Sequence, residues 1–494
     1  MKKNILANIL GRFWGILSNF LFIPLYIKFL GFESYSVISF TFILVGLMLI
    51  LDGGLTATLL REFSRKDKDR LNKISIFKTL ESFYFILSLV GILLVIVFSN
   101  YIANHWINTD HIEKDELSII LKIFGVELGF QLLFRFYMGG LLGLEKQVKA
   151  NVYQLLWGIC RNALVVVVIY YYPSLEVFII WQAVSTILFT LFLRMSLLKS
   201  FDLSRWTFSF EIDKKIIKDI GGFAGGMLLI AIVSAVNTQL DKLTISKFLD
   251  IENLGYYTLA VSLSQGLVLL VNPLLTAILP TLTGLFSENK VKESLELIKN
   301  SGLFISILVF SFLSHLIINS EKMIWIWTGN VHIAQEASPL LKIISVAYAM
   351  IALQMLPYNV AIANGYTKIN NVLGIISLFV IIPGYFIFIQ KYQSIGGAYV
   401  FCIIQIVTMF LYAYLINNKF MKFNYLFEII IKQIFIPIVI ISLITFVFSL
   451  IPIFLGKNRI FELIWIGFGV LLNLAISLVI FYPIAKIKTF IKKR

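Results

Sequence analysis

Apolar runs of about 18 residues or more recur along the whole chain, and this repetition constrains the fold more than any other feature. Each run is long enough to cross the ~30 Å hydrocarbon core of a bilayer as one α-helix. The ~10-residue alternating segments that build transmembrane barrels do not occur. Only 14% of the residues are charged, against about 25% in soluble domains. The sequence therefore predicts an all-α polytopic membrane protein.

The apolar runs define 14 expected spans, and the distribution of Lys and Arg orients them. The first run is longer than a signal-peptide core and no small-residue cleavage site follows it, so we expect an uncleaved span. One set of alternate loops, together with both termini, carries 29 of the 42 Lys and Arg residues, whereas the other set carries 7. Positive loops face the cytoplasm, so both termini are expected there. The expected spans are 5–29, 36–60, 79–100, 117–142, 151–172, 175–197, 221–247, 256–284, 301–319, 338–363, 370–389, 396–416, 433–453 and 461–485.

Two segments recur about 220 residues apart, which indicates an internal repeat. The segment that begins at Lys28 resembles the one at Lys247, and Gly143–Lys146 resembles Gly365–Lys368. The repeat contains six spans, so both copies share one orientation, as in some transporters. The expected organisation is an N-lobe at 1–198, an interfacial amphipathic linker helix at 199–220 on the cytoplasmic surface, a C-lobe at 221–425, and two peripheral spans without polar stripes plus a basic tail at 426–494.

Charged residues inside the spans must face one another or water, because each costs ~3 kcal/mol when it faces lipid. In span 117–142, Glu127, Gln131 and Arg135 are spaced four residues apart, which places them on one face of the helix. A hydrated cavity between two lobes satisfies this requirement. For the neutral polar residues, ordinary hydrogen bonding between helices explains the pattern equally well.

The first lobe contains more arginine than carboxylate within its spans. Arg12, Arg135 and Arg161 stand against Asp52 and Glu127. A guanidinium pairs bidentately with phosphate and stays charged when it is desolvated. This surplus therefore favours an anionic ligand.

One of these carboxylates interrupts a span. Asp52 lies inside span 36–60 and is followed by Gly53 and Gly54. Paired glycines permit a bend or a close approach between helices. We expect Asp52 to line the cavity opposite the arginines of the first lobe.

The net charge of +15 follows the loops, so it indicates anionic lipid as a neighbour and not nucleic acid. The four histidines show no metal-ligand spacing. Cys160 and Cys402 both lie in apolar helices and suggest no disulfide framework. No metal and no cofactor are expected.

Three stretches resemble a known family. Arg12 followed by Pro24–Val37, the stretch LDGGLTATLLREFSR at 51–65, and the stretch QLDKLTISKFLDIENLGYYTLAVSL at 239–263 are similar to the O-antigen and polysaccharide flippases of the multidrug/oligosaccharidyl-lipid/polysaccharide exporter superfamily. The resemblance covers essentially the whole chain. Gly53 is a departure, because the family more often has a bulky apolar residue there.

The resemblance implies a flippase that moves an undecaprenyl-pyrophosphate-linked oligosaccharide across the bacterial cytoplasmic membrane by alternating access. No GxxxxGK[ST] motif occurs, so an ion gradient or the membrane potential is the expected energy source. The expected partners are this lipid, membrane lipids and polysaccharide polymerase machinery, and the expected oligomeric state is a monomer. The residues expected to bind pyrophosphate or sugar are Arg12, Arg61, Gln131, Arg135, Arg161, Lys242 and Gln265, and those expected to couple ions or balance charge are Asp52, Glu127 and Asp241.

Three alternatives remain open at this point. A peptidoglycan lipid-precursor flippase shares the basic cavity and the number of spans. A drug or cation antiporter of the same superfamily would have a cavity dominated by carboxylates and aromatic residues. A membrane polysaccharide polymerase would need a sizeable external catalytic loop, and the longest external stretches here are only 101–116 and 320–337.

Overall fold

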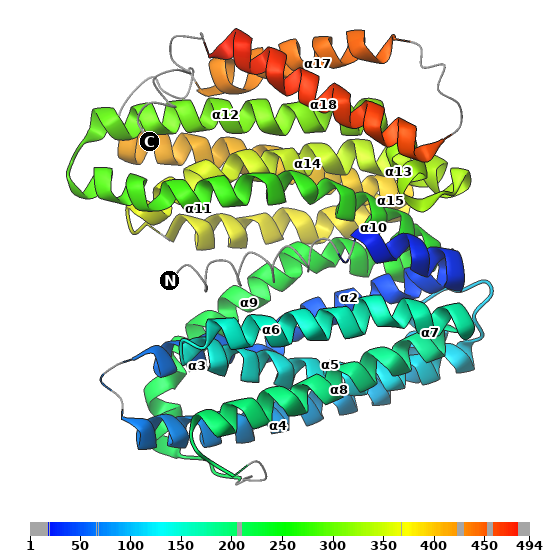
Figure 1. Ribbon diagram of the computed structural model, residues 1–494, viewed down its shortest axis with the longest axis vertical. Helices are drawn as coiled ribbons and strands as arrows, with labels where there is room; N and C mark the ends of the chain where they lie inside the picture. Colours follow the sequence, from blue (N-terminus) through cyan, green and yellow to red (C-terminus); the bar gives the residue numbers. More distant parts are fainter. Residues whose placement is uncertain are drawn as a thin grey trace. The chain divides into compact units, whose positions relative to one another are not determined.

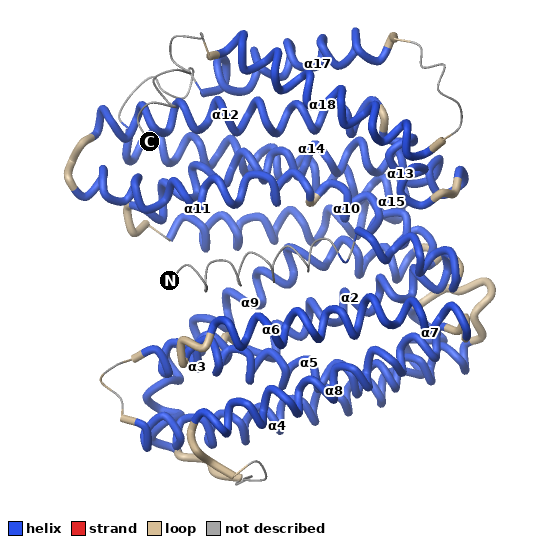
Figure 2. Tube along the Cα trace, in the orientation of Figure 1, coloured by secondary structure: helices blue, strands red, loops and turns tan. Residues whose placement is uncertain are grey.

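The computed structural model describes residue 18 and residues 20–65, 67, 69–204, 210–366, 368–421, 429–451 and 458–482. Helices and short connections account for this part of the chain, and its one strand-like contact is an isolated bridge between Asn108 and Asp250 (Figure 2). Twelve of its helices are long and apolar enough to cross a membrane. The prediction of an all-α multi-pass membrane protein is confirmed.

The chain divides into two compact units, Met1–Gly255 and Tyr256–Arg494, and each is described by itself. The elements of the first unit are α2 (Phe32–Asp52), α3 (Leu55–Ser64), α4 (Arg70–Tyr101), the π-helix η1 (Ile102–Trp106), α5 (Lys114–Gly143), α6 (Gln147–Gly158), the π-helix η2 (Ile159–Leu164), α7 (Val165–Tyr171), α8 (Leu175–Ser200) and α9 (Lys214–Phe248), followed by the start of α10 (Ile251–Ser264) (Figure 1).

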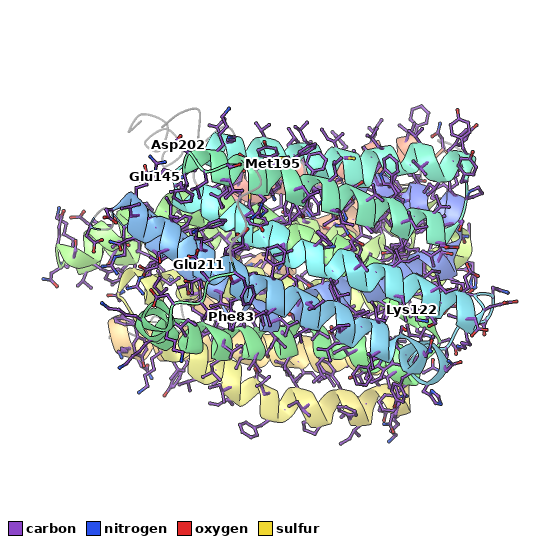
Figure 3. All side chains as sticks on the ribbon, turned by 90° about the horizontal axis from the view of Figure 1, so that it is seen from below. Phe83, Lys122, Glu145, Met195, Asp202 and Glu211 are labelled. Carbon is purple, nitrogen blue, oxygen red and sulfur yellow. The ribbon has the colours of Figure 1, made fainter. Side chains whose placement is uncertain are left out.

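Helix α5 is the centre of the first unit. It packs against α3, α4 and α8 (Figure 1). Lys122, in the N-terminal part of α5, and Glu145, just beyond its C-terminal end, lie toward opposite ends of the helix (Figure 3). Glycines let α3 approach it closely: a Cβ atom added to Gly139 would lie 2.6 Å from Cγ2 of Thr56. Small residues at such contacts are typical of helices packed in membranes.

The second unit is built around α12 and α14. Helix α14 packs against α11, α12 and α15, and α12 also packs against α17 and α18. The elements after α10 are α11 (Gly266–Ser287), α12 (Val291–Ile318), α13 (Ser320–Thr328), α14 (Val331–Ala363), α15 (Lys368–Ile416), η3 (Asn417–Met421), η4 (Ile429–Phe435), α17 (Ile436–Ser449) and α18 (Arg459–Phe481).

Several expected spans have different boundaries in the structure. Most of span 5–29 lies outside the described residues, and its end belongs to a short apolar helix, Phe20–Leu30. Spans 370–389 and 396–416 form one element, α15, with a kink where Gln393 has a φ of 56°. This break falls within the connection at 390–395 that separates the two expected spans.

Residues 199–220 are not a separate amphipathic helix in their described part, so that prediction is wrong. Residues 199–200 end α8 and residues 214–220 begin α9. Between them, the Glu211 amide donates to Ser82 Oγ at 3.0 Å and the Lys78 ammonium pairs with the Glu211 carboxylate at 2.8 Å, at the position shown in Figure 3. The backbone here is hydrogen-bonded to α4 and not to a helical turn of its own. Asp213 then caps α9 by accepting from the Lys215 amide at 2.8 Å.

The two C-terminal spans, which were expected to lack polar stripes, each bring a polar side chain into one hydrogen-bonded group. Thr445 on α17 and Asn473 on α18 are both buried. Asn473 Nδ2 donates to Thr445 Oγ1 at 2.5 Å, and that hydroxyl also contacts Ser314 Oγ of α12 at 2.7 Å. We call Ser314, Thr445 and Asn473 the polar seam. It joins the two helices to α12.

Candidate functional site

A buried ion pair joins α5 to η2 in the first unit. Arg161 Nη2 donates to Glu127 Oε1 at 2.8 Å. The same oxygen accepts from Gln131 Nε2, also at 2.8 Å. Because Glu127 is fully buried, its charge depends on these donors, and loss of one partner of such a pair typically costs about 3–5 kcal/mol.

Arg161 reaches this position from a π-helical turn. π-Helical segments are rare and occur frequently at functional sites. The wider turn leaves backbone carbonyls available to α8: Trp181 Nε1 donates to Cys160 O and Gln182 Nε2 donates to Arg161 O, both at 2.9 Å. The guanidinium also lies 5.2 Å from the ring centroid of Trp157, a cation–π contact. The turn, α8 and Trp157 together hold the Arg161 side chain in place.

A cavity of about 70 Å³ adjoins this pair. Three buried atoms here have no hydrogen-bond partner among the described residues: Glu127 Oε2, Arg161 Nε and Gln182 Oε1. They comprise two acceptors and one donor, and a cavity of this size has room for water molecules that could bind them. The residues that line the cavity are Ser18, Ile23, Tyr26, Tyr35, Ile38, Thr41, Phe42, Glu127, Arg161, Asn162, Phe178, Ile179 and Gln182.

A second carboxylate lies where α2 ends. Asp52 Oδ1 accepts hydrogen bonds from the hydroxyls of Thr56 and Tyr84. Arg135 of α5 interacts electrostatically with Asp52 and is close enough to Arg161 for repulsion between the two guanidinium groups. Arg135 is therefore near both Asp52 and Arg161.

The remaining predicted residues are distributed more widely. Lys242 Nζ on α9 pairs with Asp241 Oδ1 at 3.4 Å. Arg61 is exposed near the end of α3. Gln265 belongs to the second unit, where its Nε2 donates to the Tyr348 hydroxyl at 3.4 Å. Arg12 lies outside the described residues.

One buried charged cluster was not foreseen. Arg194 Nε of α8 donates to Glu81 Oε1 of α4 at 2.8 Å, and the Tyr137 hydroxyl of α5 donates to the same oxygen at 2.7 Å. Glu81 and Arg194 stand close to the ends of their predicted spans, where charged residues were assigned to the topological signal. Only tertiary packing reveals that they are partners.

Two interior arginines of this unit are each paired with a carboxylate. Arg161 pairs with Glu127, and Arg194 pairs with Glu81. The surplus of positive charge therefore depends on Arg135, which is half-buried, and on Arg12. Of the predicted arginines that are described in the interior, Arg135 is the one without a carboxylate in direct contact.

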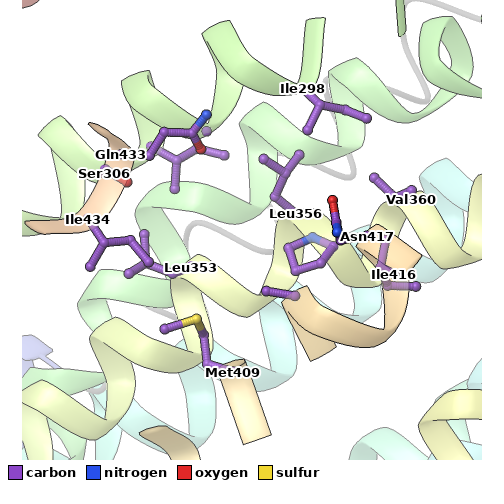
Figure 4. Close-up of a pocket in the computed structure, with 14 residues that line it drawn as sticks. Ile298, Ser306, Leu353, Leu356, Val360, Met409, Ile416, Asn417, Gln433 and Ile434 are labelled. Carbon is purple, nitrogen blue, oxygen red and sulfur yellow. The ribbon is translucent and has the colours of Figure 1, made fainter. Parts of the chain in front are cut away.

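The second unit has its own cavity, of about 50 Å³, and it is mostly apolar (Figure 4). Gln433 enters it from η4 and donates to Lys299 O at 3.3 Å. Among the residues that the structure describes, its lining contains no charged side chain. The lining residues are Ile298, Gly302, Ile305, Ser306, Leu353, Leu356, Pro357, Val360, Met409, Ala413, Ile416, Asn417, Gln433 and Ile434.

Comparisons with known proteins agree with this architecture. Residues 1–286 match the model of a family described as "Polysaccharide biosynthesis protein". A putative O-antigen transporter of Shigella flexneri is 20% identical over 369 residues, which cover 75% of this chain and 86% of that protein. The solved structure of the lipid II flippase MurJ in an inward closed conformation gives a TM-score of 0.71 at 20% identity, covering 98% of this chain and 99% of that one. An inward-facing multidrug resistance MATE family transporter of the MOP superfamily gives 0.66 at 13% identity, covering 81% and 94%.

Proposed function

Because the chain belongs to the polysaccharide biosynthesis protein family, we propose that it is a flippase for a lipid-linked oligosaccharide. The substrate is an undecaprenyl-pyrophosphate-linked repeat unit of an O-antigen or similar surface polysaccharide, which crosses the bacterial cytoplasmic membrane by alternating access. The O-antigen transporter among its relatives supports this substrate class. The fold is that of multi-pass transporters, and the protein is not an enzyme.

The observation that carries the proposal is the buried charged site of the first unit. Arg135 is half-buried beside Asp52 and Arg161, on the membrane-spanning helix that also carries Glu127 and Gln131. An arginine in the interior of a membrane protein is costly and marks a substrate or ion pathway by default. Its planar guanidinium suits the bidentate recognition of a phosphate group. We assign Arg135 to the pyrophosphate.

The other predicted residues have supporting roles in this proposal. Arg12, Arg61, Gln131, Arg161, Lys242 and Gln265 complete the binding surface for pyrophosphate and sugar. Asp52, Glu127 and Asp241 are the candidate carboxylates for coupling to an ion gradient or to the membrane potential. The polyprenyl tail stays in the lipid. A polysaccharide polymerase receives the product.

We further propose the finer topology that the sequence predicts. Fourteen spans form two six-helix lobes at 1–198 and 221–425 and a peripheral C-terminal pair. The protein is a monomer. Both termini face the cytoplasm. Labelling of single cysteines at loop positions by a membrane-impermeant thiol reagent tests the orientation. Labelling of Glu145→Cys from outside intact cells would contradict it.

The central test is transport by an Arg135→Ala variant. A hydrogen bond to a charged group is worth about 1.5–3 kcal/mol, so we expect export to fall about 10- to 100-fold with the protein still in the membrane. Arg65→Ala is the matched control, because Arg65 is exposed and paired with Asp67 at 2.5 Å. Normal export by Arg135→Ala would remove this residue from the site. In proteoliposomes, movement of lipid II in preference to the lipid-linked oligosaccharide would favour the peptidoglycan precursor instead.

A further inference from the structure

A break in the backbone separates α2 from α3, inside the span predicted at 36–60. Helix α2 ends at Asp52 and α3 begins at Leu55. Gly53 and Gly54 both adopt the left-handed conformation, with φ of 53° and 75°. An L-residue loses about 1–2 kcal/mol there. The break therefore depends on two glycines.

The Asp52 side chain bridges this break. Its Oδ1 accepts from the hydroxyl of Thr56, which lies beyond the break on α3, and from the hydroxyl of Tyr84 on α4. These two hydroxyls are 2.7 Å apart. Tyr84 is completely buried and its ring lies 4.3 Å from that of Phe136, so it is a fixed anchor. One carboxylate thus ties the end of α2 to both α3 and α4.

The surroundings of the break contain few other charges. Among the described groups that face Asp52, Arg135 comes from α5 and Tyr84 from α4. Among the described side chains of α9, Met227 lies against Gly54 and Leu228 against Gly53, and both are apolar. The charge of Asp52 is therefore sensed mainly by the two hydroxyls and by Arg135.

The three candidate coupling carboxylates differ in how they are held. Glu127 is fully buried and bound to Arg161 at 2.8 Å. Asp241 is buried and bound to Lys242 at 3.4 Å. Asp52 is half-buried and its closest partners are hydroxyls. A carboxylate in contact with a basic side chain favours its charged form, so Asp52 is the best placed of the three to take up a proton.

We propose that Asp52 is the proton-coupling carboxylate and that, through Thr56 and Tyr84, its charge latches the break between α2 and α3. The coupling role rests on the proposed function, whereas the latch is a property of the chain alone. Tyr84 is a positioning residue in this scheme, because it acts on Asp52 and not on the substrate.

The latch follows from the strength of hydrogen bonds to a charged acceptor. A carboxylate accepts bonds that are roughly twice as strong as those to a neutral group. A proton taken from water and added to Oδ2 leaves Oδ1 able to accept but removes the charge, so the ties to Thr56 and Tyr84 weaken. Arg135 loses its nearby negative charge in the same step and becomes available to an anion. Proton uptake and anion binding then favour each other, and this linkage is reciprocal.

Spin-label distances test the latch without any substrate. Labels at Leu60→Cys on α3 and Leu89→Cys on α4 use two exposed positions, in protein that also carries Cys160→Ser and Cys402→Ala. Distances are measured in lipid nanodiscs from about pH 4 to about pH 8, a range in which carboxyl groups titrate in proteins. At high pH we expect a single distance between the labels at positions 60 and 89. As the pH falls, a second label-to-label distance should appear.

Variants test whether the pH-dependent change in the label-to-label distance comes from Asp52. Asp52→Asn should show the low-pH distance at every pH, and Tyr84→Phe should move the midpoint of the transition to higher pH. Tyr412→Phe is the matched control, because Tyr412 is buried and its hydroxyl has no hydrogen-bond partner among the described residues. Glu33→Gln controls for removal of a buried carboxylate elsewhere.

The outcomes separate the two proposals. A distance in the unmodified background that does not change with pH would overturn the latch, whatever the transport assay shows. Transport driven by a pH gradient in Asp52→Asn at the normal rate would overturn its coupling role. A pH-dependent distance in a protein that does not move the lipid-linked oligosaccharide would leave the latch standing and overturn the proposed function.

Discussion

The two units differ in whether their described ion pairs include buried ones. In the first unit, Glu127 pairs with Arg161 and Glu81 with Arg194, and the carboxylate side chains are only 1% and 2% exposed. Both pairs join helices that are distant in the sequence. A buried pair of this kind is weak evidence for stability, because the cost of desolvation offsets most of the attraction.

The described ion pairs of the second unit lie at helix ends and at the surface. Glu288 pairs with Lys290 at 2.7 Å between α11 and α12, and Lys322 pairs with Glu462 at 3.3 Å. The interior of this unit is joined by neutral groups, the polar seam of Ser314, Thr445 and Asn473.

This difference indicates where function requires charge. Neutral hydrogen bonds suffice to dock α17 and α18 on α12, as is usual for helices in membranes. The first unit retains arginine and carboxylate groups that a purely structural contact would not need. Changes to the buried ion pairs of the first unit should therefore affect both folding and transport, whereas changes to the polar seam of the second unit should affect folding alone.

The largest effect is expected for Arg161→Ala. This change leaves Glu127 buried without its cation, so the free energy of unfolding should fall by about 3–5 kcal/mol. Chemical denaturation in detergent measures it. The double variant Glu127→Gln with Arg161→Gln removes both charges, so it should recover most of the stability while export stays low. Wild-type stability in Arg161→Ala would show that Glu127 has another source of neutralisation.

A smaller loss is expected in the second unit for Thr445→Val. The change removes the hydroxyl shared by Ser314 and Asn473, and a buried polar group left without a partner costs about 1–3 kcal/mol. Polysaccharide export at a permissive temperature should be normal. Ser449→Ala, on the exposed face of the same helix, is the control. Loss of export in Thr445→Val at normal protein level would contradict the division of roles between the units.

Local spacing along single helices predicted part of the charged site. Glu127 and Gln131 are four residues apart, and the structure shows the hydrogen bond that this spacing permits. The glycine pair after Asp52 predicted a bend, and α2 does end there. These features depend on the residues of a single helix, so they can be predicted from the spacing of residues in the sequence.

Contacts between helices could not be predicted in the same way. The π-helical turn at Ile159–Leu164 has no sequence signature, yet it positions Arg161. Glu81 and Arg194 each resemble an ordinary charged residue near a span end, and only packing makes them partners. Asn473 stands in an apolar helix whose neighbours in the sequence are aliphatic, and its partners lie on α17.

A still smaller effect is expected for Lys322→Gln in the second unit. The Lys322 side chain is 51% exposed and that of Glu462 is 16% exposed. Exposed ion pairs contribute about 0–1 kcal/mol, so the unfolding midpoint should fall slightly and the loss should disappear at high salt. Measurement of thermal unfolding at two salt concentrations tests this. A loss of stability as large as that of Arg161→Ala would mean that buried and exposed ion pairs contribute equally to the stability of this protein.

The smallest effect is expected for Lys290→Gln, in the loop between α11 and α12. Its hydrogen bond and its charge lower the pKa of the Glu288 carboxyl below the ordinary value. A carboxyl with a lowered pKa in the folded state adds stability above its unfolded pKa, and this contribution is lost as the pH falls through the folded value. Because both side chains are well exposed, solvent screens the pair and the contribution should be close to the limit of detection. Thermal unfolding curves of the variant and the parent should therefore nearly coincide at neutral pH and become identical well below about pH 4. A difference that grows on acidification would have the wrong sign for this pair.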